Sequence, residues 1–260
     1  MLIDSHCHLH DREFFTSEQA EEMLARAREN GIYRIVCIGT SISDSLVARE
    51  FAESHDGVFW TFGVHPNEVV SEEDLRQIQK ELAELNPEIF EDPKLVAIGE
   101  VGLDYHYEGF NRDAQIKLFE EMIGLAEKNN LPISFHVREA FPDFFEAIAK
   151  FPGVRGVIHS FTDSKKRLKR ILAETDFYVG VNGIATYMPL ALPPLERILL
   201  ETDAPFLTPK PFRGIINESA YIRNIAEWLA EQKGANFETI EKETTKNAER
   251  LFNFSDSILR

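Results

Sequence analysis

Short apolar segments alternate with amphipathic segments along most of this chain. The short segments are rich in Val, Ile, Leu and Phe, which is typical of buried β-strands. Between them apolar residues recur every three or four positions, as Ala20, Met23, Leu24 and Ala27 do within residues 17–30, and this spacing indicates helices with one buried face. The predicted strands are residues 2–4, 33–38, 58–62, 95–98, 133–136, 154–159, 177–182 and 198–201.

The regular alternation predicts the fold class. Eight strands with intervening helical segments indicate an α/β protein with a (β/α)8, TIM-like barrel. We expect closing helices after the eighth strand, at residues 217–233 and 237–252. An open doubly wound sheet is the alternative, but no glycine-rich nucleotide-binding loop follows the first strand. No linker, repeat or low-complexity tract divides the sequence, so we expect a single domain over residues 1–260.

Composition narrows the class of protein. A hydrophobic content of 43% supports a full core for 260 residues. We find no membrane-length apolar run and no N-terminal signal pattern, and therefore expect a soluble cytoplasmic protein. Cys7 and Cys37 have no paired spacing and are interpreted as reduced, buried thiols. The formal net charge of −16 argues against a broad basic surface, so a polyanionic substrate would need bound cations or a few placed basic side chains.

Histidines and carboxylates gather where the predicted strands end. His6 and His8 lie two positions apart and therefore point to the same side of a strand. Because the carboxyl ends of all strands meet at one end of a barrel, the other polar residues at strand ends should lie near them. Five of the eight histidines occupy such positions. The full set is His6, His8, His65, Glu100, His136, His159 and Asp203.

These donors predict a metal centre. Imidazole and carboxylate ligands without thiolates suit Zn, Mn, Co or Fe better than Ca, whose sites consist of oxygen atoms. Four histidines and two carboxylates are more than one ion needs. Two ions about 3.5 Å apart, bridged by a carboxylate, would use all of them.

Seven motifs around these residues extend the prediction to a family. They are DSHCHL at 4–9, GVHP at 63–66, GEVGLDY at 99–105, HVREA at 136–140, HSFT at 159–162, ETDAP at 201–205 and TKNAERLF at 245–252. In identity and order they resemble the TatD family of metal-dependent deoxyribonucleases, within the amidohydrolase superfamily. The resemblance covers nearly the whole chain.

The resemblance implies a function. It implies a metal-dependent hydrolase domain that cleaves phosphodiester bonds near DNA ends with a water activated by two divalent ions, Mg, Mn or Zn. The substrate would be DNA, single-stranded or at strand ends, because a barrel mouth accepts a terminus more readily than the middle of a stiff duplex. Neither a membrane nor an obligate protein partner is expected.

The resemblance also assigns roles to single residues. His6, His8 and Asp203 would hold one ion, and His136 and His159 would hold the other, with Glu100 bridging the two. Asp203 is also placed to take the proton of the attacking water. His65 would contact the scissile phosphate or the leaving oxygen, although it could instead cap the third strand beside Pro66. The catalytic candidates are therefore Asp203, Glu100 and His65.

The loop at residues 209–219 departs from the family pattern. Ile215 and Ile216 stand where two basic residues are usual, and Ser219 stands where proline is usual. Arg213 remains and can bind phosphate through two parallel hydrogen bonds. The missing cations put the length of the substrate and its affinity in doubt, while the metal ligands are all present. Departures that remove no ligand are Glu139 for aspartate and Asp163 for glycine.

Other polar residues allow two readings. Arg138 shares the side of its strand with His136, and either binds phosphate or forms a structural ion pair. The basic run at residues 165–170 either guides nucleic acid or forms a solvated helix face above buried leucines and isoleucine. Glu201 is expected to orient a metal ligand. The remaining histidines, His10, His55 and His106, are interpreted as ordinary polar positions.

Two other functions compete with the nuclease. The same metals could hydrolyse an ester or amide, as an amidohydrolase-type esterase or deacylase does, for example on aminoacyl-tRNA esters; the acidic surface and the missing basic pair favour this reading. A barrel that binds metal or a partner without turnover is the third hypothesis. The presence of every candidate ligand argues against it.

Overall fold

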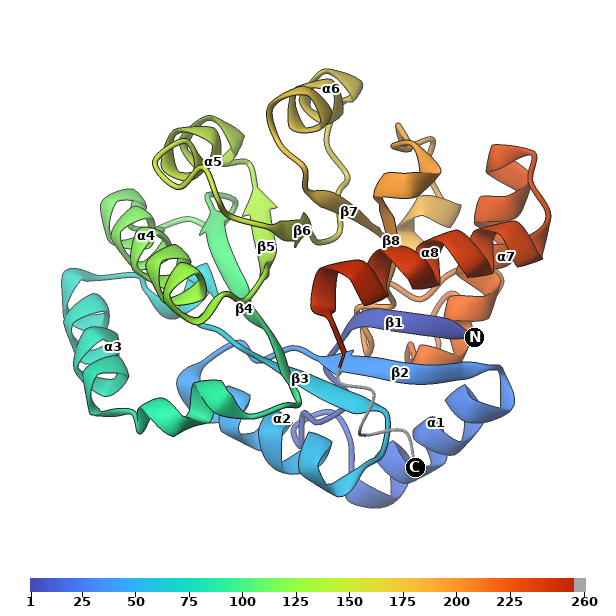
Figure 1. Cartoon of the computed structure of the whole chain (residues 1–260), viewed down its shortest axis with the longest axis horizontal. Helices are drawn as coiled ribbons and strands as arrows, with labels where there is room; N and C mark the ends of the chain where they lie inside the picture. Colours follow the sequence, from blue (N-terminus) through green and yellow to red (C-terminus); the bar gives the residue numbers. More distant parts are fainter. Residues whose placement is uncertain (255–260) are drawn as a thin grey trace.

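A parallel sheet of eight strands forms the centre of the molecule. The computed structural model describes residues 1–254, and its strands follow one another in sequence order around a nearly closed barrel with helices outside it (Figure 1). The predicted (β/α)8 barrel is therefore confirmed. The strands are β1 (Leu2–Cys7), β2 (Ile32–Cys37), β3 (Val58–Phe62), β4 (Leu95–Asp104), β5 (Ile133–Arg138), β6 (Gly156–Ile158), β7 (Tyr178–Val181) and β8 (Ile198–Leu200).

Eight α-helices are present in the described part of the chain. They are α1 (Ser17–Glu29), α2 (Ile42–Ser54), α3 (Glu72–Glu84), α4 (Arg112–Asn129), α5 (Phe141–Ile148), α6 (Lys165–Glu174), α7 (Ile222–Lys233) and α8 (Phe237–Phe252). Six begin at a Ser, Thr or Asn whose side chain accepts a hydrogen bond from the first turn. Within residues 1–254 no helix combines the length and the apolar character that crossing a membrane requires.

Short 3₁₀ turns complete the connections. They are η1 (Pro66–Glu68), η2 (Pro87–Glu91), η3 (Gly183–Thr186), η4 (Leu195–Arg197) and η5 (Ser219–Tyr221). Between β7 and β8 the chain forms only η3 and η4, so this connection contains no α-helix. The alternation of strand and helix is therefore regular through β7 and is interrupted before β8.

The barrel closes between the first and the last strand. The Ser5 hydroxyl donates a hydrogen bond to the Leu200 carbonyl over 2.9 Å, and the Asp203 amide donates to the His6 carbonyl over 2.8 Å. These contacts join segments almost 200 residues apart in sequence. They bring the carboxyl ends of β1 and β8 side by side.

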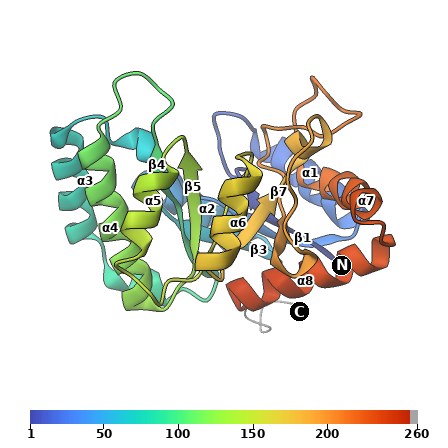
Figure 2. The ribbon, with the colours of Figure 1, turned by 90° about the horizontal axis from the view of Figure 1, so that it is seen from above.

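Helix α8 closes the opposite end of the barrel. Inward side chains such as Val36, Phe59 and Leu199 form one buried cluster with Leu251 and Phe252 of α8. Figure 2 shows α8 beneath the strands, while the blue, green and orange loops rise at the other end. With this end filled by apolar side chains, the polar strand ends lie at the open mouth.

The helix predicted over residues 217–233 begins later than expected. Helix α7 begins at Ile222, because Asn217 has other hydrogen-bond partners. The Asn217 side-chain amide donates to the carbonyl oxygens of Thr202 and Phe206. Residues before η5 therefore hold the loop after β8 instead of extending the helix.

Several strand boundaries also differ from the prediction. β1 extends to Cys7 and β4 to Asp104, so His6 and Glu100 lie inside strands rather than after them. The polar residues interrupt the apolar pattern that marks a strand in sequence. Both also lie at shifts in strand register, between Asp4 and Cys7 in β1 and between Ile98 and Val101 in β4. β6, β7 and β8 are shorter than predicted, because their last polar residues turn out of the ladder toward the mouth.

Candidate metal centre

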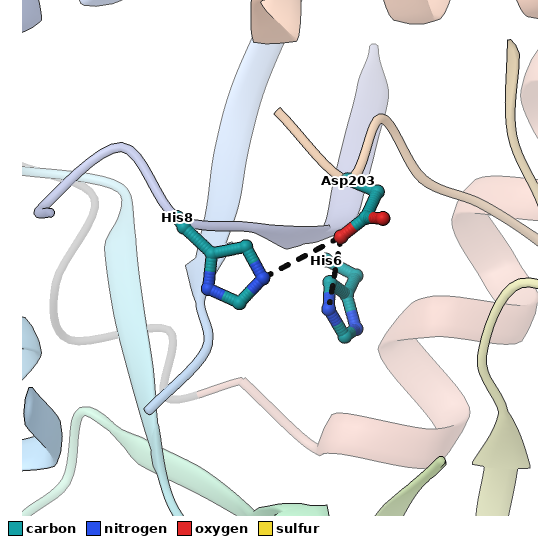
Figure 3. Close-up of side chains that lie close together, drawn as sticks. All are labelled: His6, His8 and Asp203. Carbon is teal, nitrogen blue, oxygen red and sulfur yellow. Dashed lines mark ion pairs between the residues drawn. The ribbon is translucent and has the colours of Figure 1, made fainter. Parts of the chain in front are cut away.

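His6 of β1, His8 just after β1 and an aspartate after β8 form the first group of donors. Figure 3 shows both imidazoles facing the Asp203 carboxylate. Asp203 Oδ1 lies 3.5 Å from His6 Nε2 and 3.4 Å from His8 Nε2. His8 Nδ1 lies 3.0 Å from the Ile38 carbonyl, which only an N–H can contact favourably. The Nδ1 proton is therefore directed at this carbonyl, and Nε2 is the nitrogen that faces the site and can bind a metal.

The position of Asp203 is fixed by its backbone conformation and by buried hydrogen bonds of the preceding residue. Its φ of 58° is left-handed, a conformation that Asp tolerates better than most residues. The preceding residue, Thr202, donates its amide and its hydroxyl to the two carboxylate oxygens of Asp4 over 2.9 and 2.6 Å. Burial raises the pKa of Asp4 to about 7. This contact ties β1 to β8 beside the ligands.

Glu100 lies at the centre of the cluster. Its Oε2 is 3.5 Å from His6 Nε2, and its Oε1 is 2.7 Å from His136 Nδ1. The same Oε1 lies 3.9 Å from Nε2 of both His65 and His159. One buried carboxylate therefore lies near donors from β1 and β5 and from the segments just after β3 and β6.

An irregular stretch of β4 directs Glu100 inward. The register of β4 shifts between Ile98 and Val101, and the Glu100 amide donates to the Gly39 carbonyl over 2.7 Å. A Cβ at Gly63 would lie 2.2 Å from the backbone of the residue before Glu100. Glycine at 63 is thus required for β4 to approach this closely.

His136 has a carboxylate on each ring nitrogen. Glu100 contacts Nδ1, and Asp104 Oδ2 lies 3.1 Å from Nε2. Burial opposes a charge on this ring, but the hydrogen bonds with Asp104 and Glu100 raise its pKa to about 9. With the proton on Nε2, facing Asp104, Nδ1 is the nitrogen that can ligate a metal.

His65 lies between the η1 turn and the candidate metal centre, and its contact with phosphate stays a prediction. It caps η1, because its Nδ1 accepts a hydrogen bond from the Asn67 amide over 3.2 Å. Burial and the neighbouring His136 lower its pKa to about 4, so the ring is neutral near pH 7. Since Nδ1 is an acceptor, the proton resides on Nε2, which faces Glu100. His65 therefore offers a hydrogen-bond donor to the site rather than a lone pair.

His159 lies against His6 and is oriented by Glu201. The two imidazoles stack with centroids 3.6 Å apart. Glu201 Oε1 lies 3.1 Å from His159 Nδ1 and also accepts hydrogen bonds from the Ser160 amide and the Asn182 side chain. This leaves His159 Nε2 facing the centre, as expected if Glu201 orients a ligand.

The six predicted ligands lie together, but their grouping differs from the expected pairing. His136 was expected to share an ion with His159. In the structure His136 lies with His65 and Glu100, whereas His159 lies with His6 and Glu201. Glu100 connects the groups, and the assignment of ligands to individual ions stays a prediction.

The charges of the cluster fit a bound cation. His6 Nε2 is buried without a hydrogen-bond partner, although two carboxylates lie 3.5 Å away. Burial disfavours a charge on His159, but Glu201, Asp203 and Glu100 outweigh it and raise its pKa to about 10. His159 thus retains a proton, because three carboxylates lie around its ring. A divalent cation between His6, Glu100 and Asp203 would balance the same charges and satisfy the unpaired nitrogen.

The comparison with known proteins places this geometry in a family. Residues 3–253 match the family model described as TatD related DNase. The chain belongs to the TatD-related DNase family. It is a metal-dependent hydrolase of that family, and the resemblance inferred from the motifs is confirmed.

Relatives of this TatD-family chain match it from end to end. A Bacillus subtilis protein named "Uncharacterized metal-dependent hydrolase YabD" is 38% identical, covering 97% of this chain and 99% of the relative. The Pantoea ananatis "3'-5' ssDNA/RNA exonuclease TatD" is 32% identical, covering 92% and 94%. The crystal structure of the TatD homologue YjjV from Escherichia coli superimposes with a TM-score of 0.84 at 27% identity, covering 98% of both chains.

The two arginines predicted to bind substrate lie at the mouth. Arg138 ends β5 and is exposed, with its guanidinium 5.4 Å from the centre of the Tyr107 ring. Arg213 lies in the loop after β8, 5.5 Å from the Tyr187 ring. The ion pairs found within residues 1–254 include neither arginine, and the Arg138 guanidinium instead lies beside the Tyr107 ring. Both guanidinium groups stay predicted phosphate contacts.

The basic run after β6 has its solvated face and its buried face. Leu168 and Ile171 are buried, as the second reading predicts, whereas Leu172, expected to be buried with them, is half-buried. Two of the cations are engaged, because Arg170 lies 3.8 Å from the Phe145 ring and Arg167 pairs with Asp163. The three lysines of the run are exposed.

Sequence reasoning missed the role of Asp104. It lies four positions after Glu100 in the same strand, and this spacing places both carboxylates on one face of β4. The motif containing Asp104 was identified, but its hydrogen bond to His136 crosses from β4 to β5 and has no local sequence signal.

Replacing Asp104 by asparagine is expected to reduce activity or metal affinity by about 10- to 100-fold, because His136 loses the carboxylate that fixes its tautomer. Titration of metal into the chelator-treated protein and steady-state rates measure the effect. Asp113→Asn, at an exposed site on α4, is the matched control. Equal metal affinity in Asp104→Asn and wild type would contradict this role.

Proposed function

We propose that this protein is a single-domain deoxyribonuclease of the TatD type that holds two divalent ions, Mg, Mn or Zn, and hydrolyses phosphodiester bonds near DNA ends. The observation that carries the proposal is the position of Glu100, whose two oxygens face histidines of different strands at the barrel mouth. The name of the Pantoea ananatis relative supports a nucleic-acid substrate.

The histidine tautomers support two kinds of role. His8 and His159 have their outer nitrogens engaged by a carbonyl and a carboxylate, which leaves Nε2 of each to bind metal. Bound ions would polarise a phosphoryl oxygen and lower the pKa of a water molecule. His65 Nε2–H is available to donate a hydrogen bond to the phosphate or to the leaving oxygen.

Asp203 is suited to accept a proton. Burial acts to raise its pKa, but the charge on His159 and the hydrogen bond with His8 lower it further, so the carboxylate is ionised. An ionised carboxylate can take the proton of a water beside it. Arg138 and Arg213 would hold neighbouring phosphates at the edge of the site.

The proposal predicts that purified protein with Mn or Mg shortens end-labelled single-stranded DNA, and that a chelator abolishes the activity. Denaturing gels follow the products, and restored metal should restore cleavage. Protein that leaves the DNA intact with every metal would contradict the nuclease.

A parallel assay addresses the esterase alternative, which the net charge of −16 favours. Rates on aminoacyl or other carboxylic esters are measured under the same metal. Faster turnover of the esters than of DNA ends would replace the proposed substrate class while retaining the metal centre.

A further inference from the structure

Large apolar side chains are exposed mainly at the barrel mouth. Among the described residues, eight of the eleven exposed large hydrophobic side chains lie in loops that follow strands, including Phe14, Tyr107 and Phe206. A soluble protein exposes such a concentration where it binds a partner or ligand. The mouth therefore offers apolar ring surfaces beside the candidate metal centre.

Among the exposed aromatic residues of the described chain, Phe206 has a ring contact with a candidate metal ligand. Its ring centre lies 6.4 Å from that of His8, and 46% of the residue is exposed. Its amide donates to the Asp203 carbonyl over 2.8 Å, and its carbonyl accepts from the Asn217 side chain. The backbone of Phe206 is thus anchored on both sides.

Phe14 limits the orientation of the Phe206 ring. The two rings meet nearly edge to face, at 5.2 Å and 84°. The loop that carries Phe14 is itself anchored by Phe15, which is buried, and by the amide of Phe15, which donates to the Asp11 carbonyl over 3.0 Å. Phe206 is therefore a partly exposed ring held in place from the side.

We propose that Phe206 is a stacking platform for the nucleobase next to the scissile phosphate, with Phe14 as its support. This inference rests on the proposed nuclease function and names a residue that selects the substrate. A planar base can stack on an exposed aromatic ring whatever its identity. The position of Phe206, one ring away from His8, places such a base beside the metal centre.

The negative net charge of the protein makes base stacking an important source of affinity for nucleic acid. Nucleic-acid affinity usually comes from Lys and Arg that displace counterions, but this chain has a net charge of −16. Next to Arg213, Ile215 and Ile216 are more than half exposed. Because few cations are available in this loop, apolar contact with bases would supply the affinity for nucleic acid instead. A base inside a duplex is already stacked on its neighbours, so this platform favours unpaired ends.

The test compares natural and abasic substrates with the metal-loaded protein. Single-stranded oligonucleotides carry either natural nucleotides or abasic analogues at the end that is cleaved. Phe206→Ala is expected to raise KM for the natural substrate by about tenfold, with kcat little changed. Wild type should bind the abasic substrate about tenfold more weakly than the natural one. For that substrate, Phe206→Ala should therefore raise KM little further.

Further variants separate stacking from folding. Phe206→Trp should retain the low KM, while Phe206→Leu, which keeps an apolar side chain without an aromatic plane, should raise it. Tyr33→Ala is the matched control, because Tyr33 is 48% exposed at the start of β2, away from the mouth. Its kinetics should equal those of wild type.

The outcomes distinguish this inference from the function on which it rests. Wild type that cleaves no oligonucleotide would overturn the nuclease and the platform together. Wild type that cleaves the natural substrate, with Phe206→Ala unchanged or weakened equally on both substrates, would overturn the platform alone.

Discussion

Glu100→Ala is expected to lower the rate of DNA cleavage by at least about 10³-fold, because several kcal/mol of transition-state stabilisation would depend on the metal ions that Glu100 is proposed to connect. In the described chain Glu100 lies near His6 of β1, His136 of β5 and His159, which follows β6. We also expect the variant to bind less metal, since one group of donors loses its acidic member. Steady-state rates and elemental analysis of dialysed protein measure both effects.

Two further variants control this experiment. Glu100→Gln has nearly the same shape and tests whether the charge, rather than packing, is needed. Glu84→Ala removes an exposed glutamate at the end of α3, outside the motifs at 63–66 and 99–105, and should match wild type. Turnover and metal content unchanged in Glu100→Ala would contradict its proposed bridging position.

Asp4→Ala is expected to reduce the free energy of unfolding by about 2 to 6 kcal/mol. The substitution leaves the buried amide and hydroxyl of Thr202 without acceptors, and each unpaired buried donor costs about 1 to 3 kcal/mol. Because the contact joins β1 to β8, the variant should also lose metal affinity. Urea unfolding with a common slope measures the change.

A double-mutant cycle identifies the contact itself. Thr202→Val removes the hydroxyl that donates to Asp4. The loss of stability in the double variant should therefore be smaller than the sum of the losses in the two single variants. Asp176→Ala, at a fully exposed position, should change stability little. Additive costs for Asp4 and Thr202 would show that their contact does not stabilise the closed barrel.

Several site contacts had no counterpart in the sequence pattern. Asp104 was part of a motif, yet only the pairing of β4 with β5 shows that it faces His136. Asn217 was assigned to a helix because its segment has helical character, but two carbonyls of the β8 loop hold its side chain. In both cases a long-range hydrogen bond decided the outcome.

The sequence alone determined the barrel and the candidate ligands. Strand and helix periodicities are local properties. Because the carboxyl ends of all barrel strands meet at one end, residues as distant as His6 and Asp203 are expected at the same mouth. The tertiary structure decided which nitrogen of each histidine faces the centre and which histidines share a carboxylate. These choices depend on distances of a few ångströms between strands, which are set only when β1 and β8 close the ring.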